Sequence, residues 1–433
     1  DIQAWDQPES ILRTSDGYIV AGNTDLDFLV LKVSLEGSIL WGNCYNNPDL
    51  EFSRAYEILE APGDNEYYVF GDGQSIGSSY TDIRILRIDG SGALLEEKYF
   101  GDTLEDYVYR ATPTQDGGYI IAGHENVFQS ETLYLLRLDS QLNILWRKSY
   151  NSNALTEEVI QTSDGGFVVA GTSNIWLMNS DAYLLKTDSE GNIEFERTYH
   201  SAMFERIESI FQMSDGSFMG TLIKHYLGIY SSSIVKLDSK GNILWENEHM
   251  AGFTVDMIIN GDGTFTFTGT YNHNMWLMCT DALGNTLWET FLNAGTYNHC
   301  GQAICHTENF GYFVAATTNP AAGETDVWMI NFDSYFGIES SDPEPEGLSV
   351  SMVWPNPGAE QVHIDYNMPE QAPAQISVYD AAGRRVDSIN LFTAPAGSGS
   401  YCWNPASDLP DGCYTIVIEA AGNIASQRCV LLR

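Results

Sequence analysis

The feature that most restricts the fold of this chain is an internal repeat of about 50 residues. A turn followed by an apolar run recurs as SDGYIVAG, QDGGYIIAG, SDGGFVVAG, SDGSFMG and GDGTFTFTG, with weaker copies in GDNEYYVFG and ENFGYFVAA. The seven anchor residues are Asp16, Asp64, Asp116, Asp164, Asp215, Asp262 and Asn309, so the successive spacings are 48, 52, 48, 51, 47 and 47 residues. A regular period of this length is typical of the blades of a β-propeller.

A second motif alternates with the first and completes each unit. It consists of an apolar strand, a polar turn and a strand that ends on an aromatic residue, as in LVLKVSLEGSILW, LLRLDSQLNILW and IVKLDSKGNILW. Alternating apolar residues indicate strands, and the Asp-Gly and Gly-Asn pairs suit tight hairpin turns. Each unit therefore supplies four strands, and the sequence predicts an all-β fold with a seven-bladed β-propeller over residues 1–338.

The end of the last repeat suggests how the ring closes. Only six repeats carry the outermost strand, because the seventh ends in FGIESSD without a matching aromatic residue. The first residues, DIQAWD, resemble an outer strand with Trp5 in the tryptophan position. We therefore expect the N-terminal strand to pair into blade seven and remove its exposed edge. The tryptophans of the repeats are expected to pack between blades.

A different domain follows the repeats. Residues 339–347 are polar, acidic and proline-bearing, which is typical of a linker. Residues 348–433 contain short alternating segments such as SVSMVW, QVHIDYNM, AQISVYD and CYTIVIEA. These segments predict a small β-sandwich.

The last domain resembles the C-terminal sorting domains of type IX secretion cargo, which are similar to the Ig-like domain of the flagellar hook-capping protein. The resemblance rests on WPNP at 354–357, VYDAAGRRV at 378–386, LPDGCYTIVI at 409–418 and the terminal RCVLLR. It implies a secreted protein, released or held at the cell surface of a Gram-negative bacterium, whose residues 348–433 are recognised by the secretion machinery. The alternative is an accessory domain without a sorting role.

The propeller resembles the broad group of secreted bacterial propellers with DGGY and GNxLW repeats. That resemblance implies a fold and leaves the function open, since propellers serve as enzymes, adhesins and scaffolds. The chain has 20 basic and 59 acidic residues, a formal net charge of −39. This charge argues against a nucleic-acid partner, and the sequence has no apolar run long enough for membrane insertion.

The seven cysteines show no metal-binding spacing. One disulfide among Cys402, Cys413 and Cys429 is expected if the protein is exported.

The candidate ligand-binding residues lie in the longer segments between and within blades, which should gather on one face of the propeller. Loops on a rigid scaffold commonly carry function, and aromatic side chains beside polar groups suit a glycan or an extracellular protein. The residues selected on this basis are Tyr107, Tyr109, Trp176, Tyr226, Tyr230, Tyr271, His273, Tyr297 and His299. For each aromatic residue taken singly, packing beneath a loop is the alternative role.

No catalytic motif or cofactor motif is present, so we expect a non-catalytic binding or adhesion module without a cofactor, although calcium remains an option. One alternative is a polysaccharide-active enzyme that uses carboxylates of the same face. Its candidates are Asp102, Glu105, Asp106, Glu157 and Glu158. Arg54, Arg110 and Arg206 could point to the axis as anion ligands or pair with nearby carboxylates. The other alternative is a structural subunit of a surface assembly.

Overall fold

The computed structural model describes residues 6–431 apart from 102–103, 128–129, 151–152, 174–179, 201–203, 227–228, 250–251, 293–298, 308–310, 320–324, 333–347, 355–361, 370, 381–383, 395–396, 407–408, 410–411 and 421–422. Its contacts divide the chain into two compact units. One contains Asp1–Ile259 and Thr264–Asn331, and the other contains Asn260–Gly263 and Phe332–Arg433. Within the described ranges, every named element is a β-strand. None of the described segments is a helix long and apolar enough to cross a membrane.

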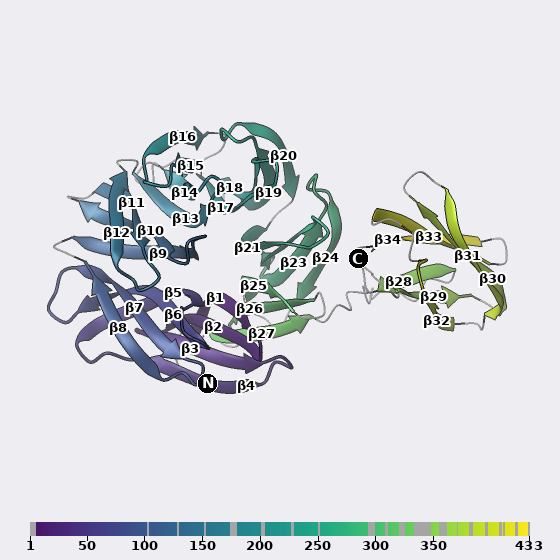
Figure 1. The fold of residues 1–433 in the computed structure, drawn as a ribbon, viewed down its shortest axis with the longest axis horizontal. Helices are drawn as coiled ribbons and strands as arrows, with labels where there is room; N and C mark the ends of the chain where they lie inside the picture. The colour runs from purple at the N-terminus through teal and green to yellow at the C-terminus, as the bar shows by residue number, and fades with distance from the viewer. Residues whose placement is uncertain are drawn as a thin grey trace. The chain divides into compact units, whose positions relative to one another are not determined.

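The first unit is a ring of seven β-sheets around a central axis (Figure 1). The inner strands are β1 (Asp6–Thr14), β5 (Leu50–Glu60), β9 (Glu105–Pro113), β13 (Ala154–Gln161), β17 (Phe204–Gln212), β21 (Phe253–Ile259) and β25 (His299–His306). The second strands are β2 (Gly17–Thr24), β6 (Glu66–Ser75), β10 (Tyr119–Val127), β14 (Phe167–Ser173), β18 (Phe218–Tyr226), β22 (Phe265–Tyr271) and β26 (Tyr312–Thr318).

The outer half of each sheet continues in the same antiparallel order. The third strands are β3 (Asp27–Ser34), β7 (Thr81–Asp89), β11 (Ser130–Leu138), β15 (Asp181–Thr187), β19 (Ile229–Leu237), β23 (Asn274–Thr280) and β27 (Asp326–Phe332). The outermost strands are β4 (Ile39–Tyr45), β8 (Leu94–Phe100), β12 (Ile144–Tyr150), β16 (Ile193–Tyr199), β20 (Ile243–His249) and β24 (Thr286–Leu292). The unit is a seven-bladed β-propeller, as the repeat predicts.

The first and last blades close the ring through packed side chains and a backbone hydrogen bond. Strand β1 contacts β25 as well as β5. Tyr18 stacks on Phe313 with the ring centroids 4.0 Å apart, and both side chains are buried. The Asp6 amide donates a hydrogen bond of 2.8 Å to the Thr325 carbonyl. The expected pairing of Trp5 and its neighbours with blade seven lies outside the described residues.

The two sequence motifs are joined by an ion pair inside the blades. The aspartate of the first motif binds a basic residue that the second motif supplies from the third strand, as in Asp16 with Lys32 at 2.5 Å and Asp164 with Lys186 at 3.0 Å. Arg137 and Asp116 make the same pair in blade three. The basic side chains are buried while the aspartates remain exposed. The aspartate thus neutralises a buried cation in addition to shaping the turn.

The aromatic residues of the outer strands pack against the turn of the following blade, which confirms the expected role of the tryptophans. The indole of Trp41 donates to the Gly90 carbonyl at 3.0 Å. Gly92 and Gly191 have φ of +80° and +77°, and a Cβ on either would lie about 3 Å from the ring of Trp41 or Trp146. Glycine is therefore required by the turn conformation and by the contact between blades.

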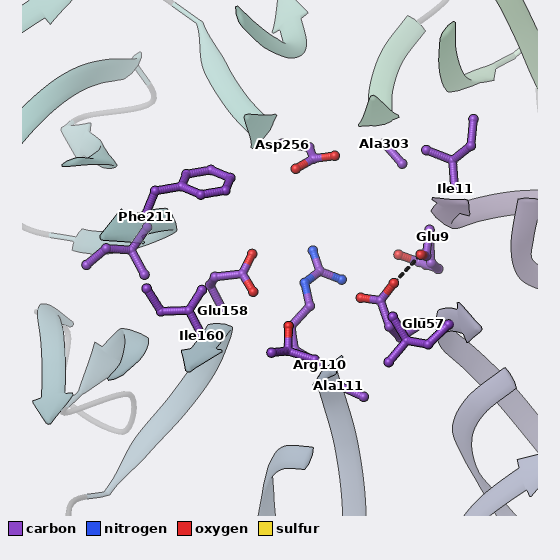
Figure 2. Close-up of a pocket in the computed structure, with 14 residues that line it drawn as sticks. Glu9, Ile11, Glu57, Arg110, Ala111, Glu158, Ile160, Phe211, Asp256 and Ala303 are labelled. Carbon is purple, nitrogen blue, oxygen red and sulfur yellow. Dashed lines mark hydrogen bonds between the residues drawn. The ribbon is translucent and has the colours of Figure 1, made fainter. Parts of the chain in front are cut away.

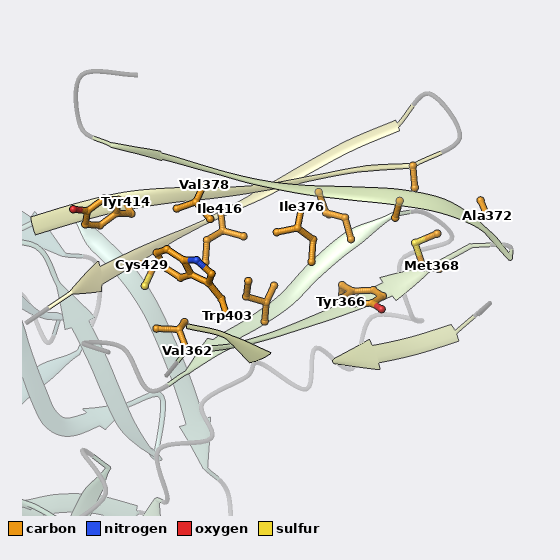
Figure 3. Packing of buried hydrophobic residues seen from close by; sticks show 14 residues of the cluster. Val362, Tyr366, Met368, Ala372, Ile376, Val378, Trp403, Tyr414, Ile416 and Cys429 are labelled. Carbon is orange, nitrogen blue, oxygen red and sulfur yellow. The ribbon is translucent and has the colours of Figure 1, made fainter. Parts of the chain in front are cut away.

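The second unit consists of two packed sheets with a single core (Figure 3). One sheet has the order β28 (Ser349–Trp354), β29 (Val362–Met368), β32 (Gly397–Trp403). The other has the order β31 (Arg385–Ala394), β30 (Ala372–Asp380), β33 (Gly412–Ala420), β34 (Asn423–Leu431). The buried indole of Trp403 lies in the core and donates to Asp387 Oδ2 at 2.8 Å.

The segments SVSMVW, QVHIDYNM, AQISVYD and CYTIVIEA, which the sequence predicts as strands, supply β28, β29, β30 and β33. Cys402 is a free thiol. The side chain of Cys413 lies outside the described residues, so the expected disulfide among Cys402, Cys413 and Cys429 stays a prediction. The expected linker, 339–347, also lies outside them.

Candidate functional site

The same irregularity occurs near the middle of every inner strand. Each inner strand carries a β-bulge where it pairs with the second strand of its blade, so one extra residue is inserted at equivalent places in all seven blades. The inserted residues are Glu9, Tyr56, Tyr109, Glu157, Glu208, Val255 and Gln302. A bulge re-aims the side chains around it.

These bulges surround a cavity of about 230 Å³ that is lined by all seven inner strands (Figure 2). Its polar wall is formed by Glu9, Ser10, Glu57, Arg110, Glu158 and Asp256. Its apolar wall is formed by Ile11, Leu59, Ala111, Ile160, Ile210, Phe211 and Ala303, and Thr112 completes the lining. The charged members of the polar wall are half-buried, so they keep contact with solvent.

The carboxylates of the polar wall bind backbone groups that the bulges leave without a partner. Glu158 Oε1 accepts a hydrogen bond of 2.9 Å from the Val159 amide. Asp256 accepts 2.7 Å and 2.9 Å bonds from the amides of Met257 and Ile304, the latter in the next blade. Buried backbone amides need such acceptors, so these acids stabilise the bulges and their side chains are fixed in place.

Glu57 is held by contacts across two blades. Its Oε1 accepts a hydrogen bond from the Ser10 hydroxyl of the neighbouring blade and a 3.3 Å bond from the Ile58 amide. Glu9 Oε1 accepts a 3.3 Å bond from the Asn23 side chain. The orientation of the polar wall is therefore set by the backbone and by neighbouring side chains.

Arg110 projects into the middle of this wall, between Glu57 and Glu158 (Figure 2). In the part of the chain that the structure describes, its guanidinium forms no hydrogen bond and no ion pair within 4.0 Å. Burial lowers the pKa of Arg110, but the charges of Glu158, Glu57 and Asp256 outweigh this effect and raise it. The guanidinium remains charged, and its donors face the cavity.

Burial also changes the titration of the carboxyl groups. It raises the pKa of Glu9 and of Glu57 to about 7, although Arg110 opposes the change. It raises the pKa of Glu158 to about 8 and also raises the pKa of Asp256. Near neutral pH the cavity therefore contains protonated and ionised carboxyl groups side by side.

A second charged group lies next to the cavity on β13 and β17. Arg206 pairs with Glu208, Nε to Oε2, at 2.5 Å and with Glu157 at 3.7 Å. Burial and the charge of Glu157 raise the pKa of Glu208 to about 8. Arg206 therefore pairs with nearby carboxylates, as one of the sequence alternatives states, whereas Arg110 does not.

Two of the expected ligand-binding residues form an aromatic group with residues of neighbouring strands. Tyr107 stacks on His124 with centroids 4.7 Å apart, and Tyr109 lies 5.2 Å from the same imidazole. Tyr56 of the preceding blade stacks on Tyr109 at 5.8 Å. Because Tyr56 and Tyr109 are bulge residues, this group lies next to the polar wall.

The other expected residues lie in different blades. Tyr230 is 45 % exposed and stacks on His225 at 4.2 Å. Tyr271 packs 5.1 Å from Phe291 in blade six. His299 is buried near Trp328, and its amide donates to the carbonyl of the exposed His273 at 2.9 Å.

Trp176, Tyr297 and the side chain of Tyr226 lie outside the described residues. The structure therefore separates the expected residues into several groups, and their role in binding stays a prediction.

The sequence analysis named Arg110 and Glu158 but overlooked Glu9, Glu57 and Asp256 as their neighbours. A signal for them was present, because Arg110, Glu158 and Asp256 each stand six residues before the anchor aspartate of their repeat, and Glu57 stands seven before its own. Charged residues at one repeat position, next to apolar residues, mark side chains that face the axis.

Calcium binding stays a prediction. Among the residues that the structure describes, no group of three or more His, Cys, Asp or Glu side chains could hold a metal ion. Asp188 Oδ1 accepts hydrogen bonds of 2.9 and 2.8 Å from the amides of Glu190 and Asn192, which accounts for that hairpin without a metal. Asp106 binds Arg147. Asp102 lies outside the described residues.

Comparison with known proteins adds to the description of both units. Residues 353–423 match the family model of the FlgD Ig-like domain. The C-terminal unit is an Ig-like domain. A search of curated protein sequences gave no match.

Solved structures similar to the chain share little sequence with it. A protein of unknown function from Dyadobacter fermentans DSM 18053 is 11 % identical, with a TM-score of 0.49, over 67 % of this chain and 96 % of that chain. Drosophila Semaphorin 2a is 9 % identical, with a TM-score of 0.46, over 99 % and 98 %. The Dos1 propeller is 11 % identical, with a TM-score of 0.43, over 83 % and 93 %. At these values no activity is inferred from the similarity.

Proposed function

We propose that this chain is a secreted, non-catalytic binding module whose propeller recognises a glycan through the axial cavity. One observation carries the proposal, namely that the cavity joins an apolar wall to a polar wall in which the Arg110 guanidinium has no hydrogen-bond or ion-pair partner among the described residues. A sugar has apolar ring faces and many hydroxyl groups, so it needs both kinds of surface.

The charged residues of the cavity favour a second candidate, a polysaccharide-active enzyme. Glycosidases use one protonated and one ionised carboxyl group. Glu158, with a pKa raised to about 8 by burial, suits the protonated role, and Asp256 and Glu57 line the same cavity. The binding function is preferred because the hydrogen bonds of these acids already give them a structural role in the bulges.

The proposed route to the cell surface depends on residues 348–433. The match to the FlgD Ig-like domain and the motifs WPNP, VYDAAGRRV and LPDGCYTIVI support a type IX sorting domain. A reporter fused to residues 348–433 should reach the medium or the surface of a bacterium that has this system, and should stay in the periplasm of a strain that lacks it. Equal export by both strains would contradict the proposal.

A glycan array probed with the full chain, with and without calcium, tests the binding function. Retention of glycans without release of sugar products supports a binding module, whereas released products support the enzyme. Arg110→Gln should abolish retention, whereas Arg197→Gln, on the outer strand β16, should not. Absence of binding under all conditions would contradict glycan recognition and favour a protein partner or a structural subunit.

A further inference from the structure

The charges of the axial cavity are unbalanced. Four carboxyl groups, from Glu9, Glu57, Glu158 and Asp256, face one guanidinium, from Arg110. Each comes from a different blade, so the excess of acid is produced by the ring as a whole. A cavity of one predominant sign, with low-dielectric walls, concentrates ligands of the opposite charge. The ligand that fits this charge is a cation.

The geometry favours an organic cation over a metal ion. The described acids do not form a group that could hold a metal, so a single ion could not satisfy them together. The volume of about 230 Å³ is below the usual range of drug-sized pockets, which begins at about 300 Å³, and it suits one small ring. The apolar wall of Ile160 and Phe211 would accept the face of such a ring.

The arginine restricts the ligand further. The Arg110 guanidinium is a charged donor group without a protein partner among the described residues, and it points into the cavity. Guanidinium groups bind oxygen acceptors, which a simple alkylamine lacks. The ligand should therefore carry oxygen atoms as well as a positive charge.

We infer that the axial cavity takes a sugar unit that bears an amine, with its ammonium group facing the carboxylates and its hydroxyl oxygens facing Arg110. This inference rests on the proposed function and adds the chemical class of the sugar. An ammonium group donates up to three hydrogen bonds, and ionised carboxylates are its strongest acceptors.

Protons and the ammonium group would compete for the same carboxylates. Burial raises the pKa of Glu9 and Glu57 to about 7 and of Glu158 to about 8, and raises that of Asp256. Other charged or titratable groups near them are Arg110, Arg54, whose charge acts on Glu9, and the cluster of Arg206 with Glu157 and Glu208. The thiols of Cys300 and Cys305 also lie nearby, and burial raises their pKa to about 12. The affinity for a cationic ligand should therefore rise as the pH increases from 6 to 8.5.

Three sugars that differ only at carbon six test the inference by calorimetric titration of the full chain. 6-Amino-6-deoxyglucose carries an ammonium group, glucose a hydroxyl and glucuronic acid a carboxylate. At pH 8.5 we expect the amino sugar to bind at least about tenfold more tightly than glucose, equivalent to about 1.4 kcal/mol, and glucuronic acid to bind most weakly. The preference for the amino sugar should fall about tenfold at pH 6, where the alkylammonium is still fully protonated.

A pair of variants on one strand locates the site. Glu57→Gln should reduce the affinity for the amino sugar about tenfold and leave that for glucose nearly unchanged, whereas Glu60→Gln, at the exposed end of β5, should change neither. The sugar series on the unmodified chain requires no variant, so it stays decisive if Glu57→Gln does not fold.

The outcomes separate this inference from the proposed function. If glucose or glucuronic acid binds more tightly than the amino sugar, the inference that the bound sugar carries an amine is wrong, while glycan recognition can still hold. The same conclusion follows if the preference for the amino sugar does not depend on pH. Retention of larger glycans on the array without binding of any of the three sugars would also overturn the inference alone. If the array and all three sugars show no binding, both proposals fail.

Discussion

At the scale of single residues, the buried basic side chains of the third strands place the strictest requirement on the repeat, because each needs an acidic partner. Lys32 and Lys186 are almost completely buried, and their partners Asp16 and Asp164 lie on the turns between the first and second strands of the same blades. A buried ammonium group without a partner is costly, so each turn aspartate contributes to stability through a residue about 20 positions away.

Asp164→Ala tests this contribution. Removing the carboxylate leaves the ammonium group of Lys186 with Glu194 as its remaining acidic partner, at 3.0 Å. The free energy of unfolding should fall by about 1–3 kcal/mol, measured from urea unfolding curves. Glu190→Ala, in the exposed turn of the same blade, is the matched control and should change it by less than about 0.5 kcal/mol. Equal losses in the free energy of unfolding for the two variants would show that the buried ion pair contributes no more to stability than an exposed turn residue.

The axial carboxyl groups make stability depend on pH. The folded-state pKa of Glu158, about 8, lies above the value of about 4.3 in an unfolded chain, so the folded state binds more protons between these values. The contribution of Glu158 to the free energy of unfolding is therefore fully present below about pH 4 and is lost as the pH rises through about 8. The glutamine of the Glu158→Gln variant does not titrate, so the variant should not show this loss. The free energy of unfolding of the variant, relative to that of the unmodified chain, should therefore rise from pH 5 to pH 8.5. A difference that stays constant with pH, in urea unfolding at each value, would contradict the raised pKa.

At the scale of elements, the blades are joined by contacts that recur in several repeats. Besides the tryptophan and glycine contact, polar side chains of second strands bind the inner strand of the next blade. Thr172 donates to the Glu205 carbonyl at 2.9 Å, and Thr270 donates to the His299 carbonyl at 2.8 Å. Asn23 accepts from the Ala55 amide at 2.7 Å. These bonds fix the inner strands, and so they position the bulges around the cavity.

Two glycine substitutions separate turn strain from packing between blades. Gly117 and Gly191 have nearly equal φ, +82° and +77°, but a Cβ on Gly117 meets nothing within 4 Å whereas one on Gly191 would meet Trp146 at 3.0 Å. Both alanine variants should lose about 1 kcal/mol of stability through strain. Gly191→Ala should lose about a further 1 kcal/mol in urea unfolding, because the indole must move. Equal losses would indicate that the contact between blades contributes little.

At the scale of the whole molecule, the propeller depends on the closure of its ring. Blades one and seven share a core that contains Tyr18, Val33 and Phe313, although they lie at opposite ends of the repeat array. The closure brings together residues nearly 300 positions apart, and it places Glu9 of the first blade beside a cavity that the later blades complete.

Tyr18→Ala should weaken this closure. Loss of the buried ring should reduce stability by about 3–5 kcal/mol. It should also increase amide hydrogen exchange in β1–β3 and β25–β27 together, because these blades share the core. Phe291→Ala, at a ring that is 41 % exposed, should leave exchange in both blades unchanged. Faster exchange confined to blade one would show that the last blade holds its structure without the first.

The sequence determined the architecture, because propeller blades are local units. The spacing of the Asp-Gly turns and the alternation of apolar residues depend on neighbours within about 50 positions, so the number of blades, the strands and the C-terminal sandwich could be predicted. The glycine and tryptophan motifs also encode contacts with the adjacent blade, which lies next along the chain. Even so, the pairing of Asp164 with Lys186 was not evident, since either residue suits an exposed turn or strand by itself.

Only the tertiary structure decided which charged residues form the candidate site. Glu57, Arg110, Glu158 and Asp256 are up to about 200 residues apart. Their shared position in the repeat indicates side chains that face the axis, but it does not indicate which of them line one cavity. They meet because each inner strand carries its bulge at the same height and the ring brings the seven bulges around one axis. The loss of solvent that raises their pKa values is likewise a property of the closed ring, since an open array of blades would leave these carboxyl groups in water.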